Sequence, residues 1–182
     1  MADGNGSGAL VEDRACGVLV GGVVGDALGA GYEFGAAPYG GWPQMIGGGL
    51  GHFDPGEWTD DTAQALAIAR VAATGADLRD PEALDAIAAG FAEWFAGGPA
   101  DVGIQTSRVL ARAGACADAA IMSTAARAVH ERTGRSAGNG SLMRTGPVAL
   151  AHLDDVQALV EAAMAVSALT HHDPLAGEGA AL

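Results

Sequence analysis

The chain has 182 residues, of which 49% are hydrophobic and 17% charged, and its formal net charge is −13. This length and apolar content predict one folded domain and argue against intrinsic disorder. The acidic balance argues against binding to a nucleic-acid backbone, which requires clustered cations. All nine cationic residues are Arg, so the sequence excludes a phosphate-binding loop that uses Lys and excludes Schiff-base chemistry on Lys.

Cysteine content and the N-terminus indicate a cellular compartment. Cys16 and Cys116 are too few for a disulfide framework and lie outside CxxC spacing, so we expect them to be small core residues. The N-terminus lacks the basic start and the long apolar run of a signal peptide. Gly and Asp interrupt the long apolar stretches, so no membrane span is expected. Together these features predict a cytoplasmic protein.

The first third of the chain contains three different kinds of segment. Residues 1–9 are small and polar and predict a flexible N-terminal tail, followed by one domain over residues 10–182. From Leu10 to Ala30, small and apolar residues recur at spacings of three and four, which predicts a helix whose glycines permit close packing. Residues 35–57 hold three of the seven prolines and eight glycines. This composition predicts a long loop, and loops of that length are usually functional or mobile.

The remainder of the chain predicts further helices. Each segment is Ala-rich with an apolar stripe and is bounded by Gly, Asp or Pro. Asp80, Pro81 and Glu82 form a helix start with Pro at the first helical position. No alternating strand pattern of useful length occurs, so the expected fold class is all-α. The expected helices span approximately residues 60–74, 81–96, 103–114, 117–132, 141–152 and 155–169.

Two adjacent carboxylates flanked by hydroxyls follow the long loop, in the stretch Trp58-Thr59-Asp60-Asp61-Thr62. Hard cations such as Mg²⁺ bind carboxylate and hydroxyl oxygens, so the cluster is a candidate metal site. The structural alternative is that Thr59 caps the helix while both aspartates complement the helix dipole. The pentapeptide alone favours the structural alternative.

Two acidic residues precede this cluster. Asp26, in the stretch GDALG, falls inside an apolar helix, where a carboxylate is seldom buried without a partner. We therefore expect a hydrogen-bonded core or capping carboxylate at this position. Glu33 lies at the mouth of the glycine-rich loop, where it either reaches a site or is solvated.

Three later stretches carry further candidate groups. Gly138 to Arg144 combine a glycine-rich turn with an expected helix start, where backbone N–H groups bind anions and Arg144 is a candidate extra cation. The structural alternative is a turn followed by an N-cap at Ser141. Asp101 by itself is typical of a helix cap. His171 and His172 lie at an expected helix end, a place that favours His even without a ligand.

Taken together and in this order, five stretches resemble the ADP-ribosylglycohydrolase family. They are GDALG with Glu33, WTDDT, DVGIQT, GNGSLMRTGPVAL and THHDP, and they span approximately residues 14–176. The resemblance implies a compact, orthogonal all-α helical bundle with a site for two metal ions, Mg²⁺ or Mn²⁺. It also implies hydrolysis of the glycosidic bond that links ADP-ribose to a modified protein side chain or a related acceptor.

The resemblance also implies a role for each matching residue. The implied metal ligands are Thr59, Asp60 and Asp61, and the implied catalytic residues are Asp61, Asp101 and Glu33, the last being mobile or gating. The residues implied to cradle the diphosphate and ribose are Gly138, Asn139, Gly140, Ser141 and Met143, with His171 lining the same site. The metals in such a site orient ribose hydroxyls and polarise a water while a carboxylate accepts its proton.

One family feature is absent from this sequence. Members carry a second metal-ligand motif, Asp-x-Asp-Thr, near their C-terminus, and the 182 residues contain none. The stretch GEGAAL also resembles an interrupted helix. Residues 10–182 are therefore expected to be the N-terminal portion of a single family domain that is completed by a C-terminal segment if the chain is nicked or truncated.

Two other functions stay open on the sequence alone. One is a non-catalytic relative that binds ADP-ribose or acts structurally, and the other is an unrelated metal-dependent hydrolase of phosphate esters, which the combined motifs disfavour. The expected partner is an ADP-ribosylated protein or a small ADP-ribosyl substrate. The acceptor can be arginine, serine, a metabolite or an ADP-ribosylated nucleic-acid end, whereas no membrane partner and no other nucleic-acid partner is expected.

Overall fold

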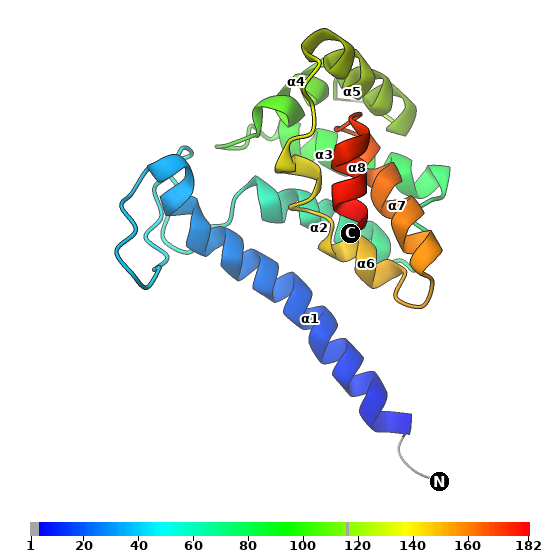
Figure 1. Ribbon diagram of the computed structural model, residues 1–182, viewed down its shortest axis with the longest axis horizontal. Helices are drawn as coiled ribbons and strands as arrows, with labels where there is room; N and C mark the ends of the chain where they lie inside the picture. Colours follow the sequence, from blue (N-terminus) through cyan, green and yellow to red (C-terminus); the bar gives the residue numbers. More distant parts are fainter. Residues whose placement is uncertain (1–3, 116) are drawn as a thin grey trace. The chain divides into compact units, whose positions relative to one another are not determined.

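The computed structural model describes residues 4–115 and 117–182. The described residues form α-helices and 3₁₀-helices and no strand, with one isolated antiparallel bridge between Gly48 and Phe53, so the expected all-α class is confirmed. The chain divides into two compact units, Met1–Thr59 and Asp60–Leu182. The helices drawn in Figure 1 are α1 (Gly4–Gly29), η1 (Ala30–Gly35), α2 (Asp60–Ala72), α3 (Pro81–Ala96), α4 (Ile104–Ala113), α5 (Ala119–Thr133), η2 (Asn139–Ser141), α6 (Gly146–Ala151), α7 (Val156–Ala168) and α8 (Pro174–Ala181).

The first unit begins with the long helix α1. This helix starts at Gly4, earlier than the start at Leu10 that the apolar pattern indicated. Its glycines were expected to permit close packing, but inside this unit no described atom lies within 4 Å of a Cβ placed at Gly17 or Gly21. The segment Gly8–Gly35 is long and apolar enough to cross a membrane by length and composition, in contrast to the expectation above. The core helices of many soluble proteins meet the same criterion.

Both cysteines were expected to be small core residues. Cys16 lies on α1 and is exposed, so the core role expected for it is wrong. Its apolar neighbours in the sequence indicated burial, but most of the described α1 side chains are themselves exposed. Cys116 lies outside the described residues.

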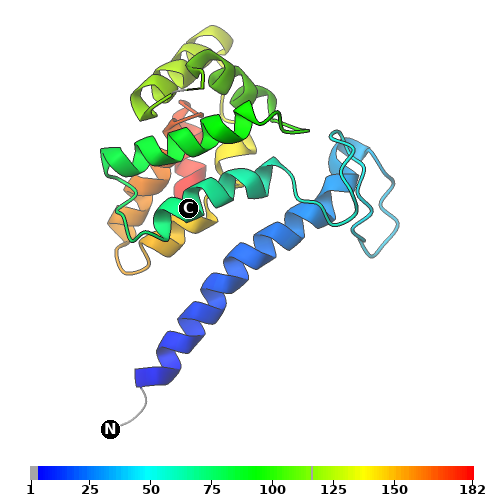
Figure 2. The same cartoon turned by 180° about the vertical axis from the view of Figure 1, so that it is seen from behind.

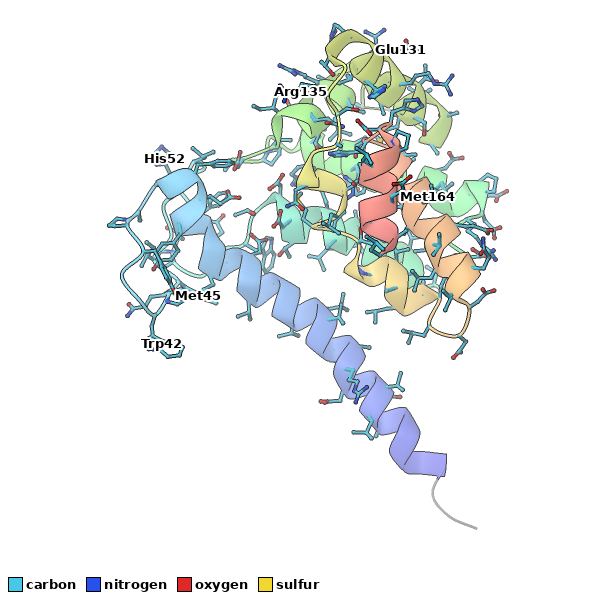
Figure 3. All side chains as sticks on the ribbon, viewed as in Figure 1. Trp42, Met45, His52, Glu131, Arg135 and Met164 are labelled. Atoms are coloured by element: carbon cyan, nitrogen blue, oxygen red, sulfur yellow. The ribbon has the colours of Figure 1, made fainter. Side chains whose placement is uncertain are left out.

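The expected loop after η1 folds back onto that 3₁₀-helix through close backbone approaches. A Cβ at Gly31 would run into the carbonyl oxygen of Gly47, and a Cβ at Gly49 would run into the carbonyl of Ala30. Glycine is required at these places because any side chain would push the two segments apart. Trp42, labelled in Figure 3, is 94% exposed on the same loop.

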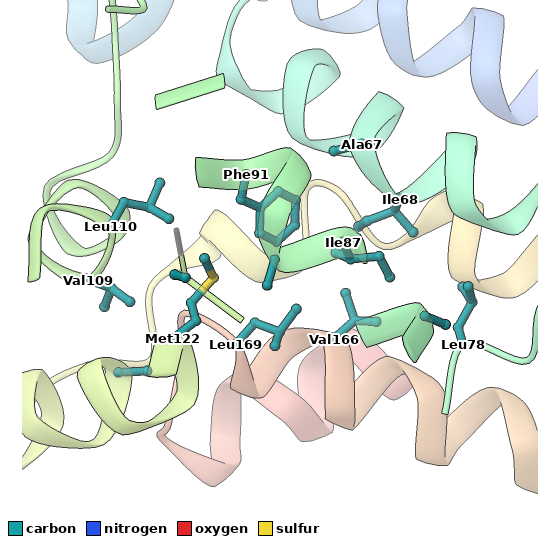
Figure 4. Close-up of a cluster of buried hydrophobic side chains, with 14 of the residues drawn as sticks. Ala67, Ile68, Leu78, Ile87, Phe91, Val109, Leu110, Met122, Val166 and Leu169 are labelled. Atoms are coloured by element: carbon teal, nitrogen blue, oxygen red, sulfur yellow. The ribbon is translucent and has the colours of Figure 1, made fainter. Parts of the chain in front are cut away.

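The second unit is a bundle of short helices. Helix α7 packs on α8, α4 packs on α5, and α2 packs on both α3 and α6, as the two opposite views in Figures 1 and 2 allow the reader to follow. Alanine occupies many of the contact positions, and its small side chain lets helices approach closely. The larger side chains of the core, several of them labelled in Figure 4, include Ile68, Leu78, Ile87, Phe91, Val109, Leu110, Met122, Val166 and Leu169.

Helix starts follow the capping signals of the sequence. Helix α3 starts at Pro81 with Asp80 at its N-cap, as predicted. The Asp80 side chain makes no capping hydrogen bond. At three other helix starts the aspartate side chain accepts a hydrogen bond from a backbone N–H of the helix that follows, namely at Asp118 before α5, Asp155 before α7 and Asp173 before α8. These caps satisfy N–H groups that have no partner inside the helix.

One expected helix differs clearly from the structure. The segment 141–152 was expected to be helical throughout, but it forms the end of η2, a turn, and then the short helix α6 from Gly146. Pro147 explains the difference, because its ring and missing N–H are tolerated in the first turn of a helix but not in its interior. Ser141 is therefore not the N-cap of a helix, which corrects the structural alternative given for it above.

We expect the core of the second unit to be sensitive to single truncations. Ile87 is completely buried, so Ile87→Ala should lower the free energy of unfolding by about 2–5 kcal/mol through lost burial and a residual cavity. The matched control is Ile104→Ala, because Ile104 is 72% exposed and its truncation should change stability by no more than about 0.5 kcal/mol. Urea unfolding followed by circular dichroism measures both, and equal losses would contradict the assigned core.

Candidate functional site

The acidic pair lies in the first turn of α2 and is tied to the start of α4. The Asp60 carboxylate oxygen Oδ2 accepts a hydrogen bond from the backbone N–H of Gly103 at 3.3 Å. It also accepts one from the Gln64 side chain, one turn along α2, at 3.4 Å. Asp61 is partly buried beside it, and Asp101 lies two residues before Gly103 and is also partly buried. Within the second unit, the fold therefore brings the start of α2 and the DVGIQT segment to one place.

Helix α4 does not use Asp101 as a cap. Its N-cap is Gly103, which has no side chain, so the structural alternative given above for Asp101 is wrong. The carboxylate of Asp101 has no capping role at this helix start, although its segment lies next to Asp60. This placement leaves the carboxyl group available for chemistry at the same end of α4.

Thr59 belongs to the first unit and is held there by Asp26. The Thr59 hydroxyl donates to Asp26 Oδ1 at 2.6 Å, and the Thr59 backbone N–H donates to Asp26 Oδ2 at 2.9 Å. Asp26 is thus the hydrogen-bonded carboxylate that the sequence predicted. Because the single hydroxyl hydrogen points to Asp26, any further bond at Thr59 Oγ1 is one that the oxygen accepts.

Glu33 also belongs to the first unit and lies where η1 is kinked. Its backbone is extended (φ −53°, ψ 139°), and Phe34 after it has φ of 51°, in the left-handed region that bulky residues rarely adopt. The Glu33 side chain is exposed. Its proposed catalytic or gating role stays a prediction.

The glycine-rich turn packs directly against His171. A Cβ at Gly140 would lie 3.0 Å from Cε1 of His171 and 3.2 Å from the hydroxyl oxygen of Thr106. A Cβ at Gly138 would lie 3.7 Å from Nε2 of the same ring. A side chain at Gly140 would therefore crowd His171 and Thr106 within the fold, in addition to any ligand that approaches the turn.

The remaining residues of the turn differ in exposure. Asn139 is exposed and Met143 is partly buried, with the Met143 N–H donating to the Asn139 carbonyl at 3.1 Å. The Ser141 hydroxyl is buried and, among the described residues, has no hydrogen-bond partner. A buried hydroxyl without a partner is costly, so a bound ligand or water at this turn would satisfy it.

The start of α4 contacts both the acidic pair and the glycine-rich turn. Gln105 donates from its side-chain amide to the carbonyl oxygens of Ser136 at 2.9 Å and Thr170 at 3.0 Å. A cleft of about 440 Å³ adjoins the turn, since Gln105 and Gly138 both line it. The other residues that line this cleft are Gly134, Arg135 (labelled in Figure 3), Ser136, Ala137 and Asp173.

Arg144 lies beneath the site and not at its surface. Its guanidinium is completely buried and donates to the Gln64 side-chain oxygen at 2.6 Å and to the Thr170 hydroxyl at 2.8 Å. It also stacks 4.3 Å above the ring centre of Phe91. The expectation that Arg144 adds a cation to an anion cradle is therefore wrong. Burial lowers the pKa of Arg144 to about 9, an effect that the nearby charge of Asp60 opposes, so the group is still cationic at neutral pH.

The site contains four polar residues for which the sequence predicted no role, namely Gln64, Gln105, Thr106 and Thr170. Gln64 was detectable, because it shares the buried face of α2 with Ala67 and Ile68 at spacings of three and four. A polar residue on such a face needs a buried partner. The other three lie inside the stretches DVGIQT and THHDP, but single polar residues near helix ends are common, so the residue pattern alone predicts no role for them.

The His171 imidazole should make folding less favourable in acid. Burial first, and then the charge of Arg144, lower the pKa of His171 to about 3, whereas an unfolded His titrates near 6.5. Below about pH 6.5 the unfolded chain therefore binds a proton that the folded chain does not. As the pH falls from about 6.5 toward about 3, the free energy of unfolding should fall by up to about 1.4 kcal/mol per pH unit from this group alone. Urea unfolding across the acid range measures the slope.

The matched variants are His171→Gln and His172→Gln. The first should lose this part of the pH dependence, whereas the second should keep it because His172 is a partly exposed neighbour. Carboxylates contribute equally to the wild type and to both variants, so the difference between slopes isolates His171. Identical slopes for the wild type and His171→Gln would contradict the assignment.

Known proteins resemble this chain in both sequence and fold. It is 37% identical to the ADP-ribosyl-[dinitrogen reductase] glycohydrolase of Rhodospirillum rubrum, over 93% of this chain and 55% of that protein. It is 47% identical over 57 residues to the ADP-ribosylarginine hydrolase Tri1 of Serratia proteamaculans, which is 31% of this chain and 16% of that protein. A solved structure described as an ADP-ribosylglycohydrolase-related protein complex matches with a TM-score of 0.65 and 31% identity, over 94% of this chain and 53% of that one.

The chain spans about half the length of the Rhodospirillum protein and of the solved structure. The family model for ADP-ribosylglycohydrolase matches residues 7–182, which is nearly the whole chain. That match includes each of the stretches on which the resemblance was based. The chain belongs to the ADP-ribosylglycohydrolase family.

Proposed function

We propose that this chain contributes to a metal-dependent ADP-ribosyl hydrolase that releases ADP-ribose from a modified protein side chain. The observation that carries the proposal is the position of the first turn of α4. This turn binds Asp60 through the Gly103 N–H and borders the Gly140 turn through Thr106. A carboxylate cluster and a glycine-rich turn beside a buried imidazole suit hydrolysis of an ADP-ribosyl bond, because the first would bind the reacting ribose and the second the diphosphate.

The names of the relatives support the substrate class. The Rhodospirillum protein is named for ADP-ribosylated dinitrogen reductase, and the Serratia protein for ADP-ribosylarginine. We therefore propose an ADP-ribosylated protein as the substrate and arginine as its modified residue. In the reaction the oxygen of water bonds to ribose C1, the bond from C1 to the guanidinium nitrogen breaks, and a proton from the water ends on that nitrogen. The products are ADP-ribose and the unmodified arginine side chain.

The residues that are present fit a hard divalent cation in kind. Asp60 and Asp61 offer carboxylate oxygens, and Thr59 offers a hydroxyl oxygen whose hydrogen is already given to Asp26. Mg²⁺ or Mn²⁺, when bound, would supply positive charge that polarises an oxygen of water or ribose. Among the described residues, however, no group of three or more acidic, His or Cys side chains lies together. Thr59, Asp60 and Asp61 would therefore be a partial ligand set for the two ions that the family pattern implies.

The chain's own groups have separate proposed tasks. Asp101 would accept the proton of the attacking water, because its carboxyl group lies beside the α4 start without a capping role. The N–H groups and the unpartnered hydroxyl of the turn Gly138–Ser141 would bind the diphosphate and ribose, together with Asn139, Met143 and His171. Glu33, at the kink of η1 in the first unit, would have the catalytic or gating role that the family resemblance implies.

A second candidate function is binding of ADP-ribose without hydrolysis. The partial ligand set favours it for this chain taken alone, because a single acidic pair does not hold two cations about 3.5–4 Å apart. The two candidates differ in one measurable property. Both bind ADP-ribose, but only the hydrolase releases it from modified protein in a metal-dependent reaction.

The decisive assay follows release of ADP-ribose from ADP-ribosylated protein with and without Mn²⁺. The chain alone should show little hydrolysis, and adding a family segment that carries the Asp-x-Asp-Thr motif should produce Mn²⁺-dependent release. Asp101→Asn should then abolish release while ADP-ribose binding, measured by calorimetry, and helical circular dichroism stay unchanged. Asp61→Asn should also abolish release, and the exposed Asp154→Asn is the matched control that should leave it unchanged.

Each result separates the candidates. Full activity of the chain alone would contradict the proposed division of metal ligands. ADP-ribose binding without release, in the presence of the added segment, would support the non-catalytic function instead. Full release by Asp101→Asn would remove that residue from the proposed role.

A further inference from the structure

The His171 ring lies between two chemically different neighbours. It is 3% exposed and occupies the segment between α7 and α8. Its Nδ1 lies 2.8 Å from the hydroxyl oxygen of Thr170. The opposite edge, with Cε1 and Nε2, faces the glycine turn at Gly138 and Gly140. Within the described residues, the hydrogen bond of this ring is the one at Nδ1.

The Thr170 hydroxyl has a single hydrogen to donate. Thr170 is completely buried, and its oxygen takes part in two hydrogen bonds, one with Arg144 Nη2 at 2.8 Å and one with His171 Nδ1. A guanidinium only donates, so the Thr170 oxygen is the acceptor in the first bond. Its own hydrogen is then the group that remains for the second.

Only one arrangement satisfies every group in this chain of bonds. If His171 donated from Nδ1, the Thr170 oxygen would accept twice and its buried hydrogen would have no acceptor, which is costly. If Thr170 donates to Nδ1, all the donors and acceptors between Arg144 and His171 are paired. In a neutral imidazole an acceptor at Nδ1 places the hydrogen on Nε2.

We propose that Arg144 and Thr170 are positioning residues that hold His171 as the neutral imidazole with its hydrogen on Nε2, directed at the glycine turn as a hydrogen-bond donor. Nε2 then binds an oxygen acceptor of the ligand, either a phosphate oxygen or a ribose oxygen, and is neither a general base nor a metal ligand. The identity of this ligand rests on the proposed function, whereas the position of the hydrogen does not. The low pKa of His171, caused by burial and by Arg144, agrees with a neutral ring.

The position of the hydrogen is measured by nitrogen-15 NMR of the imidazole rings in the ligand-free chain. The chain has five histidines. The His171→Gln variant identifies the His171 signals, because these signals are missing from its spectrum. The wild type should show a protonated Nε2 and an unprotonated Nδ1 at His171. Thr170→Val, which keeps the shape but removes the hydroxyl, should abolish this preference, and Thr170→Ser should retain it. The matched control is Thr124→Val on the exposed surface of α5.

Two NMR results would overturn the proposal. One is a hydrogen on Nδ1 in the wild type, and the other is an unchanged tautomer in Thr170→Val. Circular dichroism checks that each variant is folded. Thr170→Val removes the hydroxyl, whereas Thr170→Ser keeps the hydroxyl and removes the methyl group. A tautomer that is lost in the valine variant and kept in the serine variant therefore assigns the effect to the hydroxyl.

Ligand binding tests the second half of the proposal with ADP-ribose as the probe. Calorimetry should show roughly tenfold weaker binding for Thr170→Val, equivalent to about 1.4 kcal/mol, and near wild-type binding for Thr170→Ser. Pyrophosphate and ribose, added separately, identify which oxygen changes the Nε2 signal. Unchanged affinity in Thr170→Val would overturn the donor role. No binding of ADP-ribose by the wild type would contradict the proposed function, while the NMR result would still decide the tautomer.

Discussion

The buried guanidinium of Arg144 is the group on which the rest of the second unit depends. A buried cation is unfavourable unless its hydrogens are bonded. Here Nη1 and Nη2 donate to neutral oxygens of Gln64, Thr170 and the Val166 carbonyl, whereas Nε has no partner among the described residues. These oxygens come from α2, from the end of α7 and from the segment that follows it, while Phe91 of α3 lies against the guanidinium face. Each of these segments is therefore held at a fixed position around one charge.

This arrangement explains why the site residues lie where they do. The Gln64 side chain accepts a hydrogen bond from Arg144 through its oxygen and donates one to Asp60 through its amide nitrogen. The position of the acidic turn therefore depends on the buried guanidinium. Thr170 accepts from the same guanidinium and contacts His171, so the imidazole is fixed from the other direction. The start of α4 contacts both parts of the site, because Gly103 donates to Asp60, Gln105 donates to the Ser136 carbonyl and Thr106 lies beside Gly140. The candidate site is positioned by buried polar contacts and not by its surface loops alone.

The sequence predicted the helices better than it predicted their contacts. Local signals such as Pro81 after Asp80 act within one turn, so the start of α3 was predictable. The helix expected at 141–152 was wrong, because Pro147 fits the first turn of a helix and not its interior. The contact of Asp60 with Gly103 joins residues that are 43 positions apart, and no local pattern indicates it. Arg144 was expected to be a candidate cation for an anion site, and its burial is visible only in the fold. Gly140 was predicted to matter, but its contact with His171 is visible only in the fold.

The central claim is that one guanidinium couples the acidic turn to the His171 segment, and a double-mutant cycle on the free energy of unfolding tests it directly. The cycle combines Gln64→Leu with Thr170→Val, which remove acceptors from opposite sides of Arg144 without exchanging charge. The two side chains share this partner, so the losses should be non-additive by about 0.5–3 kcal/mol. Losses that add to within about 0.3 kcal/mol would contradict the claim, because they would show that the two sides of the site are held independently.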